Sequence, residues 1–314
     1  MLTAAPTTAQ TFPKPGKAVT IVGGFPNGSG TDIYSRRLSE PLARALGVAV
    51  IVDNRVGAGG NIAMDHVAKA EAEGHTLLFA TSAMIAINPA LYPKMAIDTM
   101  RDLAPVIALA EVPNALTVAP DRRPHFTDCK VVITEAKARP GALNYASTGN
   151  GTSTHLAGAQ FASAAGLEMV HVPYRGGPFA MQALLAGDVD ISLHQTPALV
   201  GPWRQGQVRL LGVTSRAPLR GFPGVPTMAE ACGLTGFVST TWYLLAVPAR
   251  TPRSVVANLE RIVREVISTP DFIAWVEGLG MTPMGQGPDE ARDILATDLA
   301  AWAEVVRRAG ARVD

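Results

Sequence analysis

The chain has 314 residues, with 27 lysines and arginines against 26 aspartates and glutamates, so its formal net charge is +1. This charge excludes nucleic acid as a partner, because binding a phosphate backbone requires a basic excess or a basic cluster. Hydrophobic residues make up 47% of the chain and charged residues 17%, so the sequence predicts a folded protein of about two domains and excludes a disordered one.

No stretch of the sequence approaches the roughly 20 uninterrupted apolar residues that a membrane-spanning helix needs, and we expect no membrane insertion. The first residues lack the charged and apolar regions of a signal peptide. The small residues at positions 4–10 nevertheless resemble those around a signal-peptidase site. We therefore expect that a signal peptide has been removed close to this point and that the protein is periplasmic.

Short apolar runs rich in Val and Ile alternate along the chain with segments of helical period, which is typical of βα units around parallel sheets. Unbroken apolar runs are expected where a strand is covered on both faces. The expected strands, in chain order, are Ala18–Gly23, Val48–Asp53, Thr76–Ala80, Val106–Leu109, Leu116–Ala119, Leu143–Ala146, Met169–Pro173, Val189–Leu193, Leu210–Thr214 and Tyr243–Val247.

The first helix is expected between the first two strands, over Thr31–Leu46, where apolar residues recur at helical spacing. Either Thr31 or Asp32 is its expected N-cap, Gly47 ends it, and Pro41 kinks it or weakens one turn. The C-terminal part predicts three further helices, over Ser254–Ser268, from Pro270 to Gly278, and from Pro288 onward.

Two proline-rich breaks interrupt the strand pattern and are candidate linkers. The first follows the strand that ends at Ala119, and the second follows the strand that ends at Thr214. Because another strand is expected after the second break, a second α/β lobe is predicted to interrupt the first. The expected lobes are residues 12–116 together with 237–314, and residues 117–236, joined by a hinge.

The most informative motif is the loop between the first strand and the first helix, Gly23-Gly24-Phe25-Pro26-Asn27-Gly28-Ser29-Gly30-Thr31-Asp32. Glycines let consecutive N–H groups turn toward one point, and the helix start adds the positive end of a dipole, so the loop suits an anion. A purely structural tight turn is the alternative. A phosphate-binding P-loop and the dinucleotide motif are excluded, because no Lys-Ser or Lys-Thr pair follows the glycines and position 33 is isoleucine.

Three further loops of small polar residues follow expected strands, namely Thr81–Ala83, Ser147–Ser153 and Pro173–Gly177. Ligands of open α/β sheets bind at the carboxyl ends of the strands, so these loops and the first one are expected to converge on one cleft. Each loop taken alone is also compatible with an ordinary turn. Gly57–Asn61 is interpreted as a tight connection into a helix.

The sequence contains no pattern that indicates catalysis or metal binding. Asn27 occupies the place of the first glycine of a nucleophile elbow around Ser29, and no metal-ligand spacing of His, Glu or Cys occurs. We therefore expect no catalytic residue, no metal and no cofactor. His155 is interpreted as a hydrogen-bonded structural residue rather than a general base, and Trp242 and Tyr243 are interpreted as core or hinge packing rather than as a wall of the ligand site.

Asp190 and the two cysteines leave alternatives open. Asp190 lies near a strand start, where it either solvates the edge or orients a ligand. Cys129 and Cys232 are far apart in the sequence and lack metal-like spacing. Unpaired, partly buried thiols are the favoured interpretation, and a disulfide formed in an oxidising compartment is the alternative.

Eight motifs occur in order from about residue 12 to the final helices. They are Gly28-Ser29-Gly30-Thr31-Asp32, Asp53-Asn54-Arg55 with Gly57-Ala58-Gly59-Gly60-Asn61, Ile87-Asn88-Pro89-Ala90-Leu91-Tyr92, Asn144-Tyr145-Ala146-Ser147, His155-Leu156-Ala157-Gly158, His171-Val172-Pro173-Tyr174-Arg175-Gly176-Gly177, Val225-Pro226-Thr227-Met228-Ala229-Glu230-Ala231 and Val247-Pro248-Ala249. With these motifs the sequence resembles the solute-binding proteins of tripartite tricarboxylate transporters, often called Bug proteins. Family members usually read Pro-Phe-Ala-Pro-Gly-Gly-Gly-Thr-Asp at the first loop, so ligand identity transfers less well than the fold.

The resemblance implies an α/β fold of the two-lobed periplasmic binding protein type, type II-like. Each lobe would be a mainly parallel sheet flanked by helices, with the ligand cleft between the lobes and a hinge that closes it. The implied function is to capture a small mono- or dicarboxylate and deliver it to the membrane permease subunits of a tripartite transporter. The implied protein is a monomer and not an enzyme.

The resemblance also implies that two loops hold one ligand carboxylate through backbone amides, hydroxyls and bridging waters. The matching residues of this chain are Asn27, Gly28, Ser29, Gly30, Thr31, Asp32, Tyr174, Arg175, Gly176 and Gly177. The cleft wall is expected to include Thr81, Ser82, Thr148, Asn150, Thr152 and Ser153, with Asp190 as a further candidate. Arg175 stands where lysine is common, and it either grips the anion or faces solvent.

Two other functions remain open from the sequence. The same binding protein could report its ligand to a sensor kinase rather than to a permease. An α/β enzyme acting on a small anionic substrate would use the same loops, with Ser29 or His155 in its chemistry.

Overall fold

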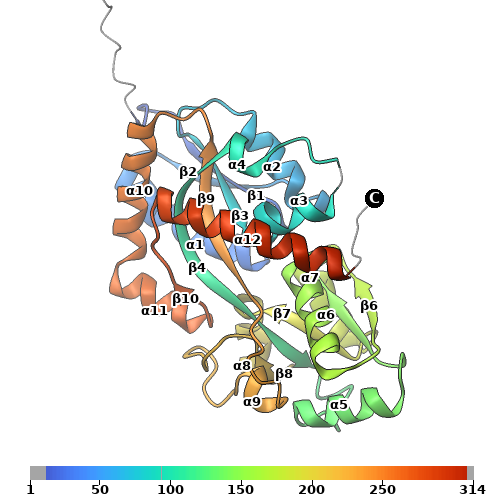
Figure 1. The fold of residues 1–314 in the computed structure, drawn as a ribbon. Coiled ribbons are helices and arrows are strands. Elements are labelled where there is room, and N and C mark those ends of the chain that lie inside the picture. Colours follow the sequence, from blue (N-terminus) through green and yellow to red (C-terminus); the bar gives the residue numbers. More distant parts are fainter. Residues whose placement is uncertain (1–11, 93, 310–314) are drawn as a thin grey trace, which may run out of the picture.

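The structure is a computed structural model that describes residues 12–92 and 94–309, so the signal-like stretch at positions 4–10 lies outside the described residues. One mixed sheet runs the length of the molecule, with helices packed around it (Figure 1). Its strand order is β2-β1-β3-β9-β4-β7-β5-β6, and β10 and β8 pair with β4 off this path. Within the described ranges, no helix is long and apolar enough to cross a membrane.

The first half of the sheet contains three parallel strands and the antiparallel strand β9. Its strands are β1 (Val19–Gly23), β2 (Val50–Asn54), β3 (Thr76–Thr81), β9 (Thr240–Pro248), β10 (Thr282–Pro283) and the first part of β4 (Leu103–Val118). Its helices are α1 (Gly30–Leu46), η1 (Ala58–Gly60), α2 (Asn61–Ala68), η2 (Ala83–Ile87), α3 (Asn88–Leu91), α4 (Thr99–Asp102), α10 (Arg253–Ile267), α11 (Pro270–Gly278) and α12 (Pro288–Ala309).

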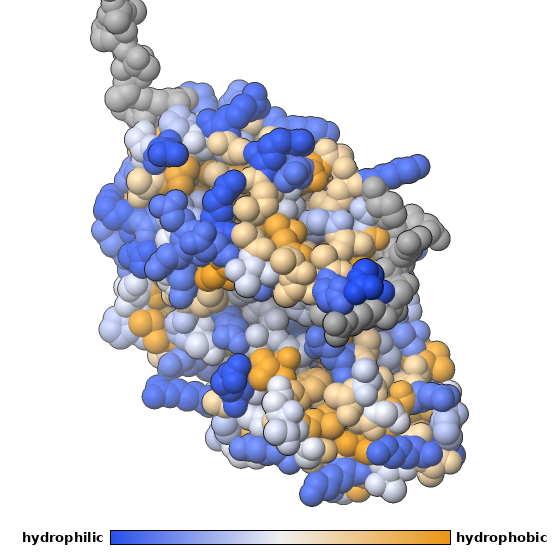
Figure 2. All heavy atoms as spheres, in the orientation of Figure 1, coloured by the Kyte–Doolittle hydropathy of each residue, from blue (hydrophilic) through white to orange (hydrophobic). Residues whose placement is uncertain are grey.

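Helices cover both faces of this half. Leu77 and Phe79 of β3 lie in the core beneath α1, α10 and α11, whereas Leu78 and Ala80 lie in the core beneath α2 and α12. Both faces of the strand therefore need apolar residues, which explains the unbroken runs read from the sequence. Figure 2 shows hydrophilic side chains spread over much of the visible surface, with apolar ones in small groups between them.

Helix α1 positions the glycine-rich loop that precedes it. Its N-cap is Ser29, whose hydroxyl oxygen accepts a hydrogen bond from the Asp32 amide at 3.3 Å. The expected cap at Thr31 or Asp32 is therefore wrong, because both residues already lie inside the helix. Gly47 ends the helix with a φ of +68°, as predicted, and Pro41 lies inside it.

The second half of the sheet contains the parallel strands β5, β6 and β7 and the remaining part of β4. Its strands are β5 (Asn144–Ser147), β6 (Val170–Pro173), β7 (Ile191–Gln195) and β8 (Arg209–Val213). Its helices are α5 (Cys129–Ala138), α6 (Ser153–Ala165), α7 (Gly177–Ala186), η3 (Thr196–Ala198), α8 (Val200–Arg204) and α9 (Met228–Ala231).

A disulfide joins Cys129, at the start of α5, to Cys232, which follows α9. The favoured interpretation of two unpaired thiols is therefore wrong. The residues are 103 positions apart, but the packing of α5 beside α9 in one core brings them together.

Strand β4 joins the two halves of the sheet. It is a single strand of 16 residues where the sequence predicted two separate strands. From Leu103 to Pro113 it pairs with β9, and from Asn114 onward it pairs with β7 and β8, always antiparallel. The parallel pairs expected from the sequence therefore flank a central antiparallel pair, β4 and β9. The boundaries of the two lobes, at residues 116/117 and 236/237, stay a prediction.

Candidate ligand-binding site

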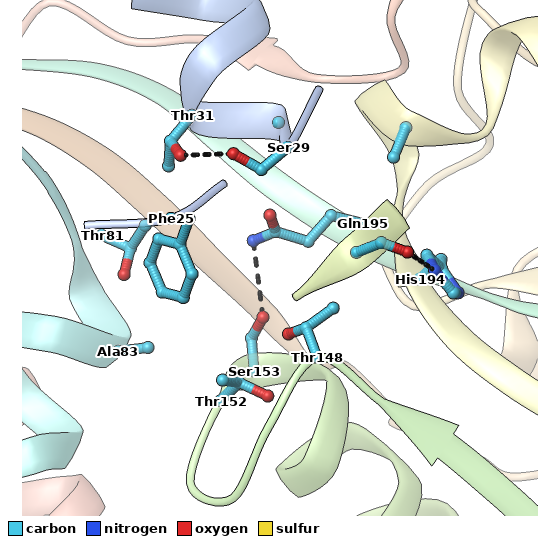
Figure 3. Close-up of a pocket in the computed structure, with 13 residues that line it drawn as sticks. Phe25, Ser29, Thr31, Thr81, Ala83, Thr148, Thr152, Ser153, His194 and Gln195 are labelled. Atoms are coloured by element: carbon cyan, nitrogen blue, oxygen red, sulfur yellow. Dashed lines mark hydrogen bonds between the residues drawn. The ribbon is translucent and has the colours of Figure 1, made fainter. Parts of the chain in front are cut away.

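A narrow cavity lies at the carboxyl ends of strands from both halves of the sheet. The volume that the centre of a water molecule can occupy is about 40 Å³. The lining residues, most of which Figure 3 labels, are Phe25, Ser29, Gly30, Thr31, Thr81, Ala83, Thr148, Thr152, Ser153, Gly177, His194, Gln195 and Ala198. None of these residues carries an aspartate, glutamate, lysine or arginine side chain.

Three helices, α1, α6 and α7, begin at this cavity. The first amides of a helix have no partner within the helix. In the part of the chain that the structure describes, the amides of Gly30, Thr31, Ser153 and Gly177 donate to no protein acceptor. The cavity is therefore bordered by free N–H donors and by the positive ends of three helix dipoles, an environment that favours an anion.

Hydroxyl groups add further donors to the same wall. The Thr81 hydroxyl oxygen accepts from the Met84 amide at 3.2 Å, and the Ser153 hydroxyl oxygen accepts from Gln195 Nε2 at 3.4 Å. No acceptor within the described residues takes the hydroxyl hydrogen of Thr81 or Ser153, so both are available to a bound anion. Ser29 Oγ and Thr31 Oγ1 share one hydrogen bond of 3.0 Å, which leaves one more hydroxyl hydrogen for a ligand.

The loop from β5 to α6 is held by its own polar groups. The Thr152 hydroxyl donates to the Gly149 carbonyl at 2.7 Å and caps α6. His155 Nδ1 accepts from the Gly151 amide at 3.0 Å, and the His155 ring stacks on His171 with centroids 3.9 Å apart. Burial, together with the neighbouring His155, lowers the pKa of His171 to about 4. Burial also lowers the pKa of His155, which supports the loop through its hydrogen bond from Gly151. This is the hydrogen-bonded structural role that the sequence analysis favoured.

A wider outer pocket of about 510 Å³ adjoins the cavity. Phe25, Thr148 and Thr152 line both spaces. The outer pocket is further lined by Gly24, Pro26, Val56, Gly57, Ala58, Gly59, Tyr92, Gly149, Asn150, Tyr174, Arg175 and Gly176. Arg175 supplies the one cationic side chain among these lining residues.

The structure brings most of the residues expected from the sequence to this place. Around the inner cavity are Ser29, Gly30, Thr31, Thr81, Thr148, Thr152, Ser153 and Gly177. Around the outer pocket are Asn150, Tyr174, Arg175 and Gly176. Five expected residues line neither space, namely Asn27, Gly28, Asp32, Ser82 and Asp190.

Four of these five support the loops from behind. The buried Asp32 carboxylate accepts from the Gly28 amide at 2.9 Å, from Arg36 at 2.9 Å and from Asn54 at 2.7 Å. Burial acts to raise the pKa of Asp32, but these hydrogen bonds outweigh burial and lower the pKa below its ordinary value. Asn54 also donates to the Asn27 side chain. The Ser82 hydroxyl oxygen accepts from a backbone amide of β9.

Asp190, for which the sequence left two interpretations open, lies away from both spaces. Asp190 precedes β7, whereas the cavity lies at the other end of that strand, where Gln195 is found. The Asp190 carboxylate pairs with Arg123 and accepts from the Asn144 amide at 2.9 Å. It therefore fixes the opposite edge of the sheet.

The sequence analysis missed three lining residues, His194, Gln195 and Ala198, whereas Phe25 and Ala83 lie in loops that it expected at the cleft without naming them as ligand contacts. Gln195 and His194 come directly after the expected strand Val189–Leu193, so the strand-end rule could have found them. His194 is buried, which lowers its pKa to about 4. Its Nε2 donates to the Gly177 carbonyl at 3.2 Å and thereby holds the start of α7.

Comparisons with known proteins agree with this geometry. Residues 34–311 match the model of the tripartite tricarboxylate transporter family receptor. Protein BugT of Bordetella pertussis (strain Tohama I) is 34% identical over 311 residues, covering 99% of this chain and 94% of BugT. The structure described as R. palustris Rpa4515 with adipate has a TM-score of 0.91 at 31% identity, covering 95% of this chain and 99% of that chain.

A second solved structure, MatC of Rhodopseudomonas palustris with bound malate, has a TM-score of 0.85 at 29% identity and covers 93% of this chain and 100% of its own. These likenesses extend over nearly the whole chain and include both halves of the sheet. The chain therefore belongs to the tripartite tricarboxylate transporter receptor family of periplasmic binding proteins, which bind a solute and are not enzymes.

Proposed function

We propose that the protein captures a small carboxylate, in particular a dicarboxylate, between the two halves of the sheet and delivers it to the membrane subunits of a tripartite transporter. The observation that carries this proposal is the meeting of three helix N-termini, with unpartnered amides, at a cavity lined by no charged side chain. Amide and hydroxyl donors satisfy an acceptor-only group such as a carboxylate, whereas a cationic ligand would find no counter-charge there.

The two spaces differ in size, which favours an elongated ligand. The volume open to the centre of a water molecule is about 40 Å³ in the inner cavity and about 510 Å³ in the outer pocket, so the inner cavity suits one carboxylate group and the outer pocket suits the rest of a longer ligand. The rest of the ligand would pass Phe25 and enter the outer pocket, where Arg175 would meet a second anionic group. The two relatives described with adipate and malate hold dicarboxylates, which supports the same choice for this chain.

The energy of such a complex is reasonable. Micromolar affinity corresponds to about −8 kcal/mol. Hydrogen bonds to a charged group contribute roughly 1.5–3 kcal/mol each, so four amides and two or three hydroxyls exceed this amount in gross terms. The surplus offsets an association cost of at least about 4 kcal/mol.

We further propose that residues 12–116 and 237–314 act as one lobe and residues 117–236 as the other. The change of strand partners at Asn114 of β4 and the start of β9 at Thr240 support hinge points close to these boundaries. Closure about them would bring the helix starts of both lobes onto the ligand.

A ligand screen tests the proposal. Thermal shift and calorimetry are measured with acetate, succinate, L-malate, glutarate and adipate, and with glycerol phosphate as the comparison anion. At least one dicarboxylate is expected to raise the melting temperature and to bind more tightly than acetate. Stabilisation by glycerol phosphate with no response to any carboxylate would contradict the proposal. Uptake of the bound acid by membrane vesicles that contain the permease, dependent on this protein, tests delivery.

A further inference from the structure

We propose that Gln195 is a specificity-determining ligand contact and that Tyr243 is the residue that positions it. This inference rests on the proposed carboxylate function. We infer that Tyr243 holds the Gln195 amide so that its NH₂ group, and not its oxygen, faces the bound carboxylate.

Gln195 lies at the centre of the cavity. It ends β7, and its side chain extends between the loop that carries Ser29 and Thr31 and the start of α6 at Ser153 (Figure 3). Gln195 Oε1 accepts from the Tyr243 hydroxyl at 3.0 Å. Gln195 Nε2 donates to Thr241 Oγ1 at 3.2 Å and to Ser153 Oγ at 3.4 Å.

Two partners fix the orientation of this amide. Tyr243 is fully buried among aromatic rings, and its burial raises the pKa of the phenol well above the ordinary value, so it is a neutral donor. Its hydroxyl hydrogen has Gln195 Oε1 as its acceptor among the described residues. The Thr241 hydroxyl donates its hydrogen to the Val112 carbonyl. The Thr241 oxygen can therefore only accept a hydrogen bond from Gln195, and Gln195 must present its NH₂ group there. A flipped amide would leave the Tyr243 hydrogen unpaired and would place two acceptors together at Thr241.

The donors of Gln195 are available to a ligand. Hydrogen bonds of 3.2 and 3.4 Å are at or beyond the long end of the usual range for an N–H donor, and a carboxylate oxygen would replace the Ser153 bond with a shorter, charge-assisted one. Gly30 keeps the start of α1 close to this amide. A Cβ at position 30 would lie 2.5 Å from the Tyr243 hydroxyl oxygen and 3.3 Å from Gln195 Oε1.

The consequence is selection for the ionised acid. An amide or a protonated acid keeps a carbonyl oxygen that can accept from these donors, but its second polar group carries hydrogen, and that N–H or O–H group would face the remaining donors without a hydrogen bond. Gln195 therefore adds a side-chain donor between the backbone donors at the starts of α1 and α6.

The test compares variants of Gln195 and Tyr243 with the wild type by calorimetry at pH 7.5. The probes are succinate, L-malate, glutarate and adipate, each with its diamide. Gln195→Glu keeps the shape and the acceptor for Tyr243 but replaces the donor by a charge, and it is expected to weaken acid binding by about 100-fold or more. Relative to the wild type at the same pH, binding by this variant should recover as the pH is lowered toward 5, because the introduced carboxyl group, once protonated, again presents a donor. Gln207→Glu, an exposed substitution of equal charge outside the cleft, should bind as the wild type does.

Tyr243→Phe separates positioning from simple loss of structure. With the hydroxyl removed, the Gln195 amide is free to turn. Acid binding is then expected to weaken about 10-fold and diamide binding to weaken less. The dissociation constants of the acid and of its diamide should therefore become more similar than in the wild type. A purely structural role for Tyr243 would weaken both ligands equally and would overturn the positioning role. Equal acid affinity in Gln195→Glu and wild type would overturn the inference while leaving the carboxylate function intact. A wild type that binds none of the four acids would overturn both.

Discussion

Asp32 acts on the binding loop from behind. Its buried carboxylate accepts hydrogen bonds from the Gly28 amide, Arg36 and Asn54. These bonds hold the Gly28–Thr31 turn in the conformation in which the amides of Gly30 and Thr31 face the cavity. Asp32, which the sequence motif suggests as a ligand contact, thus supports the neighbouring backbone donors instead.

The substitution Asp32→Asn should weaken this support. The introduced amide side chain would turn an NH₂ group toward one of the three donors, so we expect a loss of about 1–3 kcal/mol of unfolding free energy and an affinity for carboxylates reduced roughly 10-fold. Urea unfolding and calorimetry measure the two effects. Glu40→Gln, which breaks an exposed pair with Arg44 on the same helix, should change neither.

Arg175 should distinguish ligands by their length. In Arg175→Gln the outer pocket loses its cationic side chain, so the affinity for a dicarboxylate is expected to fall about 10-fold, as for loss of one charge-assisted hydrogen bond. Acetate binding should stay unchanged, because a single carboxylate fills only the inner cavity. Arg204→Gln on α8 is the control for the change in net charge. Equal losses for acetate and dicarboxylate would show that Arg175 acts on the protein and not on the far end of the ligand.

At the scale of elements, the starts of α1, α6 and α7 provide the cavity with donors, and the segments between strands and helices aim them. The loop before α6 depends on two neutral histidines beneath it. His155 Nδ1 accepts a hydrogen bond from the Gly151 amide. A proton on Nδ1 would break this bond, because two N–H groups would then face each other. The site therefore requires His155 to remain neutral.

Stability should consequently decrease on acidification. The folded protein holds His171 and His194 neutral down to about pH 4, whereas an unfolded chain binds a proton on each near pH 6.5. Between these values the unfolded state binds more protons, so the unfolding free energy should fall as the pH is lowered from about 6.5 to 4, by roughly 1–3 kcal/mol for His171. Urea unfolding at pH 7.5, 6, 5 and 4.5 measures this slope. His171→Gln should flatten it, and an unchanged slope in that variant would contradict the assignment.

At the scale of the whole molecule, β4 and α12 connect the two halves in different ways. Strand β4 passes from one half of the sheet to the other. Helix α12 extends over the first half toward α6 and α7 (Figure 1), and its Val306 packs with Leu91 of α3 and Leu156 of α6. Strand β4 crosses between the halves at the predicted hinge. The contact of Val306 is apolar, and opening of the lobes would disrupt it.

The disulfide stabilises the second half. It closes a segment of about one hundred residues that contains α6, α7 and strands β5 to β8, so reduction, or the double variant Cys129→Ala and Cys232→Ala, should lower the unfolding free energy by about 2–5 kcal/mol. Denaturant unfolding with and without a reducing agent measures this loss. The double variant itself should be insensitive to the reducing agent, and ligand affinity measured well below its unfolding transition should be retained.

Local sequence determined several strands, the first helix and the loops of this protein. Strands such as β1 and β3 could be predicted because burial on both faces demands unbroken apolar runs, and α1 could be predicted because its apolar spacing ends at Gly47. The donor-rich loops could be recognised because glycine, serine and threonine recur at several strand-to-helix junctions, where the free amides of a helix start suit an anion. Each of these signals is contained in a short stretch of the chain, the longest being the 17 residues of α1.

Only the tertiary structure decided which of these residues share a site and what holds them. Three contacts each join residues that are far apart in the chain, namely the disulfide of Cys129 with Cys232, the ion pair of Asp190 with Arg123, and the hydrogen bond from the Tyr243 hydroxyl to Gln195. The joining of two expected strands into the single β4 likewise depends on the pairing offered by β9, β7 and β8. Such partners are set by how the halves of the sheet pack, and no local pattern of residues encodes that packing.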